Sequence, residues 1–180
     1  MTSTEVSVAD ELRRLDHLLT TLDGIREEGA EVLATRAPEV SGWSVEQHLY
    51  HTALATDLAL GNVRAAATGK GMLVREEGEL GDWAAEVLGR DEQPRGVTEA
   101  PRMVRPGETV DPAFLAQEQA GNRRVLEELG ELAEAIASST SWVPHQDLGT
   151  LRAAHWLRFA ALHARHHLAI VEDVRAAAGG

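Results

Sequence analysis

The last long segment of the chain, Leu151 to Ala178, limits the possible folds most strongly. Its apolar positions recur at alternating steps of four and three residues, so they line one face of an α-helix. The stripe consists of Trp156, Ala160, His163, His167, Ile170 and Val174. A stripe of this kind normally fills the seam of a helical bundle with aliphatic side chains, but here two of its positions are histidines. The segment therefore predicts a bundle helix that presents two imidazoles to the interior.

Three further segments have helical apolar periodicity, and with the last one they predict an all-α four-helix bundle. They run from Val8 to Thr35, from Val45 to about Ala67, and from Ala113 to about Ala137. Helix-start signals precede the later segments: Ser44 with Gln47 as a capping box, Asp111 before Pro112, and Thr150 as the cap of the fourth helix. The chain has 180 residues, so we expect residues 1–180 to form a single domain.

The connection between the second and third helices, residues 69–111, is long and irregular. It is rich in Gly, Pro, Glu and Arg, and only a short helix from about Gly81 to Leu88 is expected within it. Connections of this length in a compact domain are usually functional or mobile. We expect this one to lie over one end of the bundle, where it can form a wall of a pocket.

Composition excludes several classes of function. The formal net charge of −12 argues against nucleic acids and anionic membrane surfaces as partners, because both are bound by concentrated Lys and Arg. The chain has no cysteine, which excludes disulfides, thiolate metal sites and cysteine nucleophiles. No stretch approaches the roughly 18 apolar residues that cross a bilayer, and the start does not resemble a signal peptide. We therefore expect a cytoplasmic protein.

The histidines predict a metal site. His163 and His167 are four positions apart, so their imidazoles can reach a common atom from one helix face. Catalytic divalent-metal sites commonly use three protein ligands and leave a position to water. The natural third ligand is a histidine of the second helix, with His51 as the first candidate and His48 as the second. These two diverge by about 60° around the helix, so one should be a ligand and the other should lie beside it.

Two stretches carry a family resemblance. One is Trp43-Ser44-Val45-Glu46-Gln47-His48-Leu49-Tyr50-His51; the other comprises His145, Leu148 to Leu151, Trp156-Leu157 and His163 to Ile170. They resemble the DinB-like superfamily of metal-binding four-helix bundles, which includes YfiT-type metal-dependent hydrolases and bacterial low-molecular-weight-thiol S-transferases. The resemblance implies His51, His163 and His167 as the ligands, leaves His48 and His166 outside that set, and implies a homodimer. The long connection 69–111 departs from the family pattern.

The expected function is that of a divalent-metal enzyme acting on a small molecule, with zinc or nickel as the expected ion. The ion could lower the pKa of a bound water for hydrolysis, or activate a small thiol cosubstrate as a thiolate for transfer to an electrophile. No general base is evident from the sequence, and His48 is the candidate for that role.

Two other interpretations stay open. The chain could be a non-catalytic stress-response or ligand-binding bundle with a structural metal or none. It could also be a plain bundle whose core histidines are satisfied by carbonyls or carboxylates, in which case His51 would not meet His163 and His167. Trp43 and Trp156 are expected to be core aromatics rather than substrate platforms.

Overall fold

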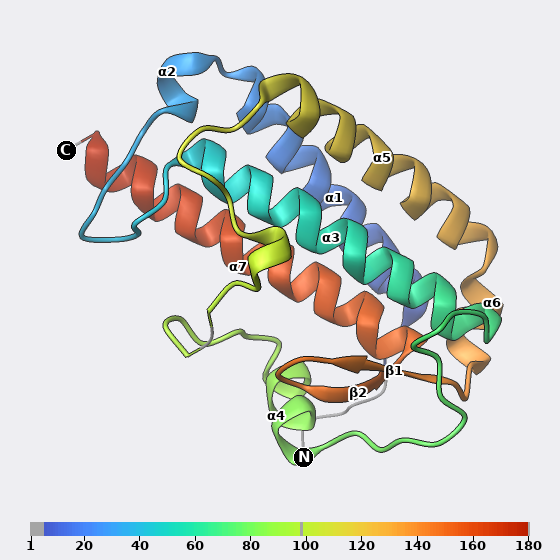
Figure 1. The fold of residues 1–180 in the computed structure, drawn as a ribbon. Helices are drawn as coiled ribbons and strands as arrows, with labels where there is room; N and C mark the ends of the chain where they lie inside the picture. The colour runs from blue at the N-terminus through green and yellow to red at the C-terminus, as the bar shows by residue number, and fades with distance from the viewer. Residues whose placement is uncertain (1–5, 98, 180) are drawn as a thin grey trace.

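The computed structural model of the chain describes residues 6–97 and 99–179. Its long helices are α1 (Val8–Glu27), α3 (Val45–Thr68), α5 (Pro112–Glu131) and α7 (Ala153–Ala178). Both α1 and α3 pack against α5 and against α7, so the four helices enclose one apolar core (Figure 1). The predicted all-α four-helix bundle is confirmed. Within the described residues, no helix combines the length and the apolarity that crossing a bilayer requires.

Shorter elements connect the long helices. In chain order they are α2 (Ala30–Leu33), α4 (Asp82–Arg90), the 3₁₀ helix η1 (Arg102–Val104), α6 (Ala133–Ser138), β1 (Trp142–His145) and β2 (Gly149–Arg152). Helix α4 and the two-stranded hairpin lie at the same end of the bundle, whereas η1 lies on α3 nearer its middle (Figure 1). The short helix expected near residues 81–88 is therefore present as α4.

Local capping explains where two of the long helices begin. The Ser44 side chain accepts from the Gln47 backbone N–H at 3.2 Å, and the Gln47 side chain accepts from the Ser44 N–H at 3.0 Å. This capping box starts α3 one residue later, at Val45, as predicted. At the start of α5 the Asp111 side chain accepts from the backbone N–H groups of Ala113 and Phe114, and Pro112 lies in the first turn. Each cap of this kind contributes about 1 kcal/mol to stability.

Two predicted helices are interrupted. The first ends at Glu27, and the chain resumes as α2 only after Gly29, whose φ of 106° is incompatible with a continuous right-handed helix. The third is divided at Leu132, whose φ of −97° and ψ of 11° separate α5 from α6. Prediction of unbroken helices to Thr35 and Ala137 was therefore wrong in both cases.

The start of the fourth helix was also predicted wrongly. Residues 142–152 form an antiparallel hairpin in which Trp142 pairs with Arg152 and His145 with Gly149, so α7 begins at Ala153. Thr150 lies in β2 and does not cap α7. Its hydroxyl instead donates to the Glu79 carbonyl at 2.7 Å and accepts from the Glu79 N–H at 3.1 Å. The hairpin thereby holds the first part of the long connection.

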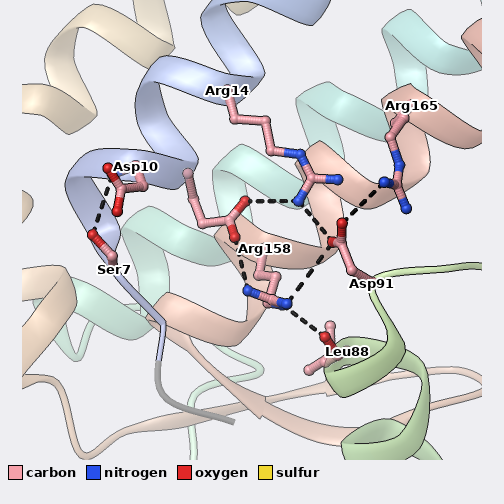
Figure 2. Close-up of polar contacts among 8 residues, drawn as sticks. Ser7, Asp10, Arg14, Leu88, Asp91, Arg158 and Arg165 are labelled. Carbon is pink, nitrogen blue, oxygen red and sulfur yellow. Dashed lines mark hydrogen bonds and ion pairs between the residues drawn. The ribbon is translucent and has the colours of Figure 1, made fainter. Parts of the chain in front are cut away.

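A cluster of arginines attaches α4 to the bundle, and Asp91 is its centre. Asp91 ends α4 in the left-handed conformation, with φ at 55°. Its carboxylate lies 2.7 Å from Nη1 of Arg14 on α1, 3.0 Å from Nη1 of Arg165 on α7 and 3.9 Å from Nη2 of Arg158 on α7 (Figure 2). The end of α4 is therefore held by charge from two helices of the bundle.

Arg158 links this cluster to the interior. Its Nε donates to the Leu88 carbonyl at 2.7 Å (Figure 2). Its Nη1 lies 3.0 Å from Oε1 of the buried Glu11. Burial raises the pKa of the Glu11 carboxyl, and the positive charges of Arg14 and Arg158 oppose that rise. The contacts of Asp91 and Arg158 thus hold α4 against α1 and α7. Helix α4 in turn forms part of the wall of a cavity.

Candidate metal centre

Three buried histidines converge between α3 and α7. His51 on α3 and His163 and His167 on α7 each place one ring nitrogen so that the three atoms lie within 4.8 Å of one another. The Nε2 atoms of His51 and His163 are 3.2 Å apart. The four-residue spacing on α7 brings the rings of His163 and His167 to a centroid separation of 4.6 Å. The structure therefore brings together all three residues that the sequence indicated as ligands, and no carboxylate belongs to this group within the described residues.

A backbone carbonyl holds His51 in the tautomer that a metal ligand needs. The Nδ1–H of His51 donates to the Val104 carbonyl at 3.0 Å, so its Nε2 keeps a lone pair on the side facing His163. Metal-binding histidines usually donate their second ring N–H to a carbonyl or carboxylate in this way. Val104 is buried in η1, and the long connection therefore orients a residue of the site. The donor set fits a divalent ion.

His48 lies beside the three histidines and contacts one of them. Its Nδ1 is 3.1 Å from Nδ1 of His167, and its Nε2 is 2.8 Å from the Ser41 hydroxyl oxygen. That oxygen also accepts from the Trp43 backbone N–H at 3.2 Å. With Nδ1 of His167 engaged by His48, Nε2 is the nitrogen that His167 has left for an ion. His48 thus supports a candidate ligand through a chain that ends at Ser41.

Burial keeps these imidazoles neutral. Burial lowers the pKa of His48 to about 4, with repulsion from His51 as the next cause. Burial, together with the neighbouring imidazoles, also lowers the pKa of His163 and of His167 well below the ordinary value. The pKa of His51 is lowered by burial as well, although its hydrogen bond to Val104 opposes the shift. Neutral rings are the form that binds metal, so no proton competes for them at pH 7.

A cavity of about 790 Å³ opens beside the three histidines. Described residues between 93 and 105 line much of it, so the expectation that the long connection walls a pocket is confirmed. Other lining residues come from α3, α4, the hairpin and α7. Both Trp43 and Trp156 line the cavity, but they differ in burial. Trp43 is half-buried, with its ring centroid 5.1 Å from that of His51, whereas Trp156 is buried and its indole N–H donates to the Val143 carbonyl at 3.1 Å. The expectation of a core role therefore holds for Trp156 and not for Trp43.

Two further histidines border the cavity. Nδ1 of His145 accepts from the backbone N–H groups of Asp147 and Leu148, at 3.1 and 3.2 Å, so the neutral ring carries its proton on Nε2. His166 is half-buried and lies edge-on to His167, with ring centroids 5.0 Å apart, but does not belong to the converging group. Sequence patterns did not reveal Ser41, which lies in a helix break, or Val104, which acts through a carbonyl that every residue possesses.

Of three comparisons with known proteins, one gives a match. A family model described as the DinB superfamily matches residues 9–171. No curated protein and no solved structure matches the chain. The matched span includes α3 and α5 in full, α1 except for its first residue, α7 as far as Val171, and all three converging histidines. On this evidence the chain belongs to the DinB superfamily.

Proposed function

We propose that this protein is a divalent-metal-dependent enzyme whose ion is held by His51, His163 and His167. The observation that carries the proposal is the convergence of three buried, neutral imidazoles from two helices at the edge of a cavity of about 790 Å³. Three imidazoles would suit zinc or nickel and would leave room in the coordination sphere for a small molecule. A bound divalent cation supplies Lewis acidity there, and it lowers the pKa of a water or a thiol in the open position.

The surrounding residues bind and orient the three imidazoles. Val104 fixes the His51 ring through its carbonyl, and the chain from Ser41 through His48 fixes the His167 ring. Both ring nitrogens of His48 are engaged in these contacts, so we assign it to positioning His167 rather than to general-base catalysis. The Trp43 ring packs against both rings, with its centroid 5.2 Å from that of His48 and 5.1 Å from that of His51.

The same ligand set serves two reaction types. In hydrolysis, water adds to the carbonyl carbon of an ester or amide, and the alcohol or amine leaves with a proton. In S-transfer, the sulfur of a small thiol cosubstrate gives up its proton and attacks an electrophilic carbon, whose bond to a leaving group breaks. Structural metal sites use all coordination positions for protein ligands. The cavity beside these three histidines is much larger than one water, which favours a catalytic ion over a purely structural one. The small molecule that reacts is therefore expected to enter through this cavity.

Metal analysis of the purified protein tests the site. We expect close to one equivalent of metal in the wild type, and strong loss in His51→Ala and in His163→Ala. His17→Ala is the matched control, since His17 is exposed on α1, and it should keep its metal. Circular dichroism checks that the variants stay helical. Full metal retention in both ligand variants would defeat the proposal.

The reaction type is tested with the metal-loaded protein. Neutral esters and amides probe hydrolysis, and a low-molecular-weight thiol with an alkylating electrophile probes S-transfer. Activity that disappears with a chelator and returns with added zinc or nickel supports an enzyme. Full metal binding without either activity would instead favour a non-catalytic ligand-binding bundle.

A further inference from the structure

The exposed apolar side chains of this protein gather at the cavity. Seven large hydrophobic residues are exposed in the described part of the chain, and five of them line the cavity: Leu58, Leu73, Trp83, Val97 and Met103. They come from α3, from α4 and from separate parts of the long connection, so they are not the leftover face of one helix. Contiguous exposed apolar surface in a soluble domain marks a binding surface.

Apolar lining continues from this rim to the three histidines. The Phe159 ring lies 5.6 Å from the His163 ring, and it borders the same cavity as the rim residues. On the other side, the Trp43 ring lies 5.1 Å from the His51 ring. A ligand whose reacting group reaches the histidines therefore has its remaining atoms against hydrophobic side chains.

The charges on the lining do not favour an anionic ligand. Among the described lining residues, Arg105 is the one Lys or Arg, and its Nη2 is already bound by the Glu99 carboxylate at 3.3 Å and the Ala100 carbonyl at 2.9 Å. The lining also carries two carboxylates, those of Glu99 and Asp147. A carboxylate or phosphate on the non-reacting part of a ligand would have to compete with the Glu99 carboxylate for this one guanidinium.

The dimensions point to a small molecule. A volume of about 790 Å³ lies within the range of roughly 300–1,000 Å³ that is typical of small-molecule sites. We propose that the substrate carries an uncharged hydrophobic group, an alkyl or aryl chain, which binds along this lining from Phe159 to the rim at Leu58 and Leu73. This inference rests on the proposed function for the reacting end of the substrate, but hydrophobic binding requires no metal and can be measured alone.

The test uses N-phenyl-1-naphthylamine, a neutral fluorescent probe, with the metal-free and the metal-loaded protein. Straight-chain primary alcohols of increasing length should displace the probe, and each added methylene should tighten competition by a factor of about four until the cavity is filled. Carboxylates of the same length should compete more weakly with the metal-free protein. Absence of any chain-length dependence, or stronger competition by the carboxylates, would overturn the inference.

Rim variants locate the binding. Leu73→Ser and Leu58→Gln should each lower the affinity for the probe by about fivefold or more, because each removes apolar contact area. Met72→Ser is the matched control: Met72 is adjacent in the chain and fully exposed, and it does not line the cavity. Equal affinity in all three variants would contradict the proposal.

Sedimentation of the same variants tests the rival explanation, that a second copy of the chain covers the rim. Conversion of a dimer to a monomer in Leu73→Ser and Leu58→Gln, with probe affinity unchanged, would overturn the inference. Measuring the metal content as well distinguishes failure of the hydrophobic-substrate inference from failure of the proposed enzyme function. A protein that binds the alcohol series but no metal refutes the enzyme proposal alone, and a metal-loaded protein without chain-length dependence refutes the hydrophobic substrate alone.

Discussion

The Nε2 atoms of His51 and His163 lie 3.2 Å apart, although 112 positions separate the two residues in the chain. Two neutral imidazoles at this distance share one proton. His51 already donates from Nδ1 to Val104, so its Nε2 accepts and the proton belongs to Nε2 of His163. For both nitrogens to face an ion, the proton of His163 has to reside on Nδ1 instead. His51 is therefore already in the tautomer that binds a metal through Nε2, whereas His163 has to move its proton from Nε2 to Nδ1 first.

The chain from Ser41 through His48 to His167 should control metal affinity. His48→Gln and Ser41→Ala are each expected to weaken metal binding by roughly 10- to 100-fold, since partners that orient ligand histidines have effects of that size. Competition with a chelating dye measures the affinity. His17→Gln, on the exposed face of α1, serves as the control and should leave it unchanged. Wild-type affinity in both site variants would show that this chain does not orient His167.

Acid should destabilise the metal-free protein through His48. Above pH 6.5 the ring is neutral in the folded and in the unfolded chain, so burial carries no ionisation cost. Between pH 6.5 and about 4 the unfolded chain binds a proton at this ring and the folded chain does not, so the free energy of unfolding falls as the pH falls. The loss attributable to His48 is about 3 kcal/mol over that range.

Urea denaturation of the metal-free protein at pH 7 and pH 4.5 measures this effect. His48→Gln cannot take up the proton, so its free energy of unfolding should fall less between the two pH values than that of the wild type. An identical fall in both proteins would contradict the assignment to His48.

Asp91 should hold α4 against the bundle. Asp91→Asn keeps a side chain that tolerates the φ of 55° but removes the charge facing Arg14, Arg158 and Arg165. We expect a loss of about 1–2 kcal/mol in the free energy of unfolding and faster hydrogen exchange of the α4 amides. The control is Glu86→Gln, which removes an exposed pair with Arg90 and should cost less than about 0.5 kcal/mol. Unchanged exchange in α4 would refute this role for Asp91.

Gly78 should be required for packing of the long connection on the hairpin. A Cβ at this position would lie 2.7 Å from Cγ of Trp142 and 2.9 Å from its Cδ2, so Gly78→Ala is expected to destabilise the protein by about 1–3 kcal/mol. Gly61→Ala is the opposite control: Gly61 is inside α3 with nothing within 4 Å of the added atom, and alanine there should stabilise by about 0.5–1 kcal/mol. Thermal unfolding of the two variants gives the sign of each effect.

The bundle and its converging histidines could be predicted because they depend on short-range regularities. A helical apolar period repeats within seven residues, a capping box spans Ser44 to Gln47, and the spacing of His163 and His167 alone places them on one helix face. These patterns ranked His51 before His48 as the third member but left both open, and the family resemblance implied His51. The helix breaks at Gly29 and Leu132 were missed because an apolar period continues across them.

Features built from distant pairs could not be predicted. The partner of His48 is 119 positions away at His167, His51 is oriented by a carbonyl 53 positions later at Val104, and Thr150 pairs with Glu79 across 71 positions. The local sequence permits many such pairings. The one that forms is selected when α3 packs against α7 and the long connection packs against both helices. The helices follow from propensity and periodicity within each segment. The shape of the cavity and the orientation of its imidazoles depend on contacts that form only when all the segments pack together.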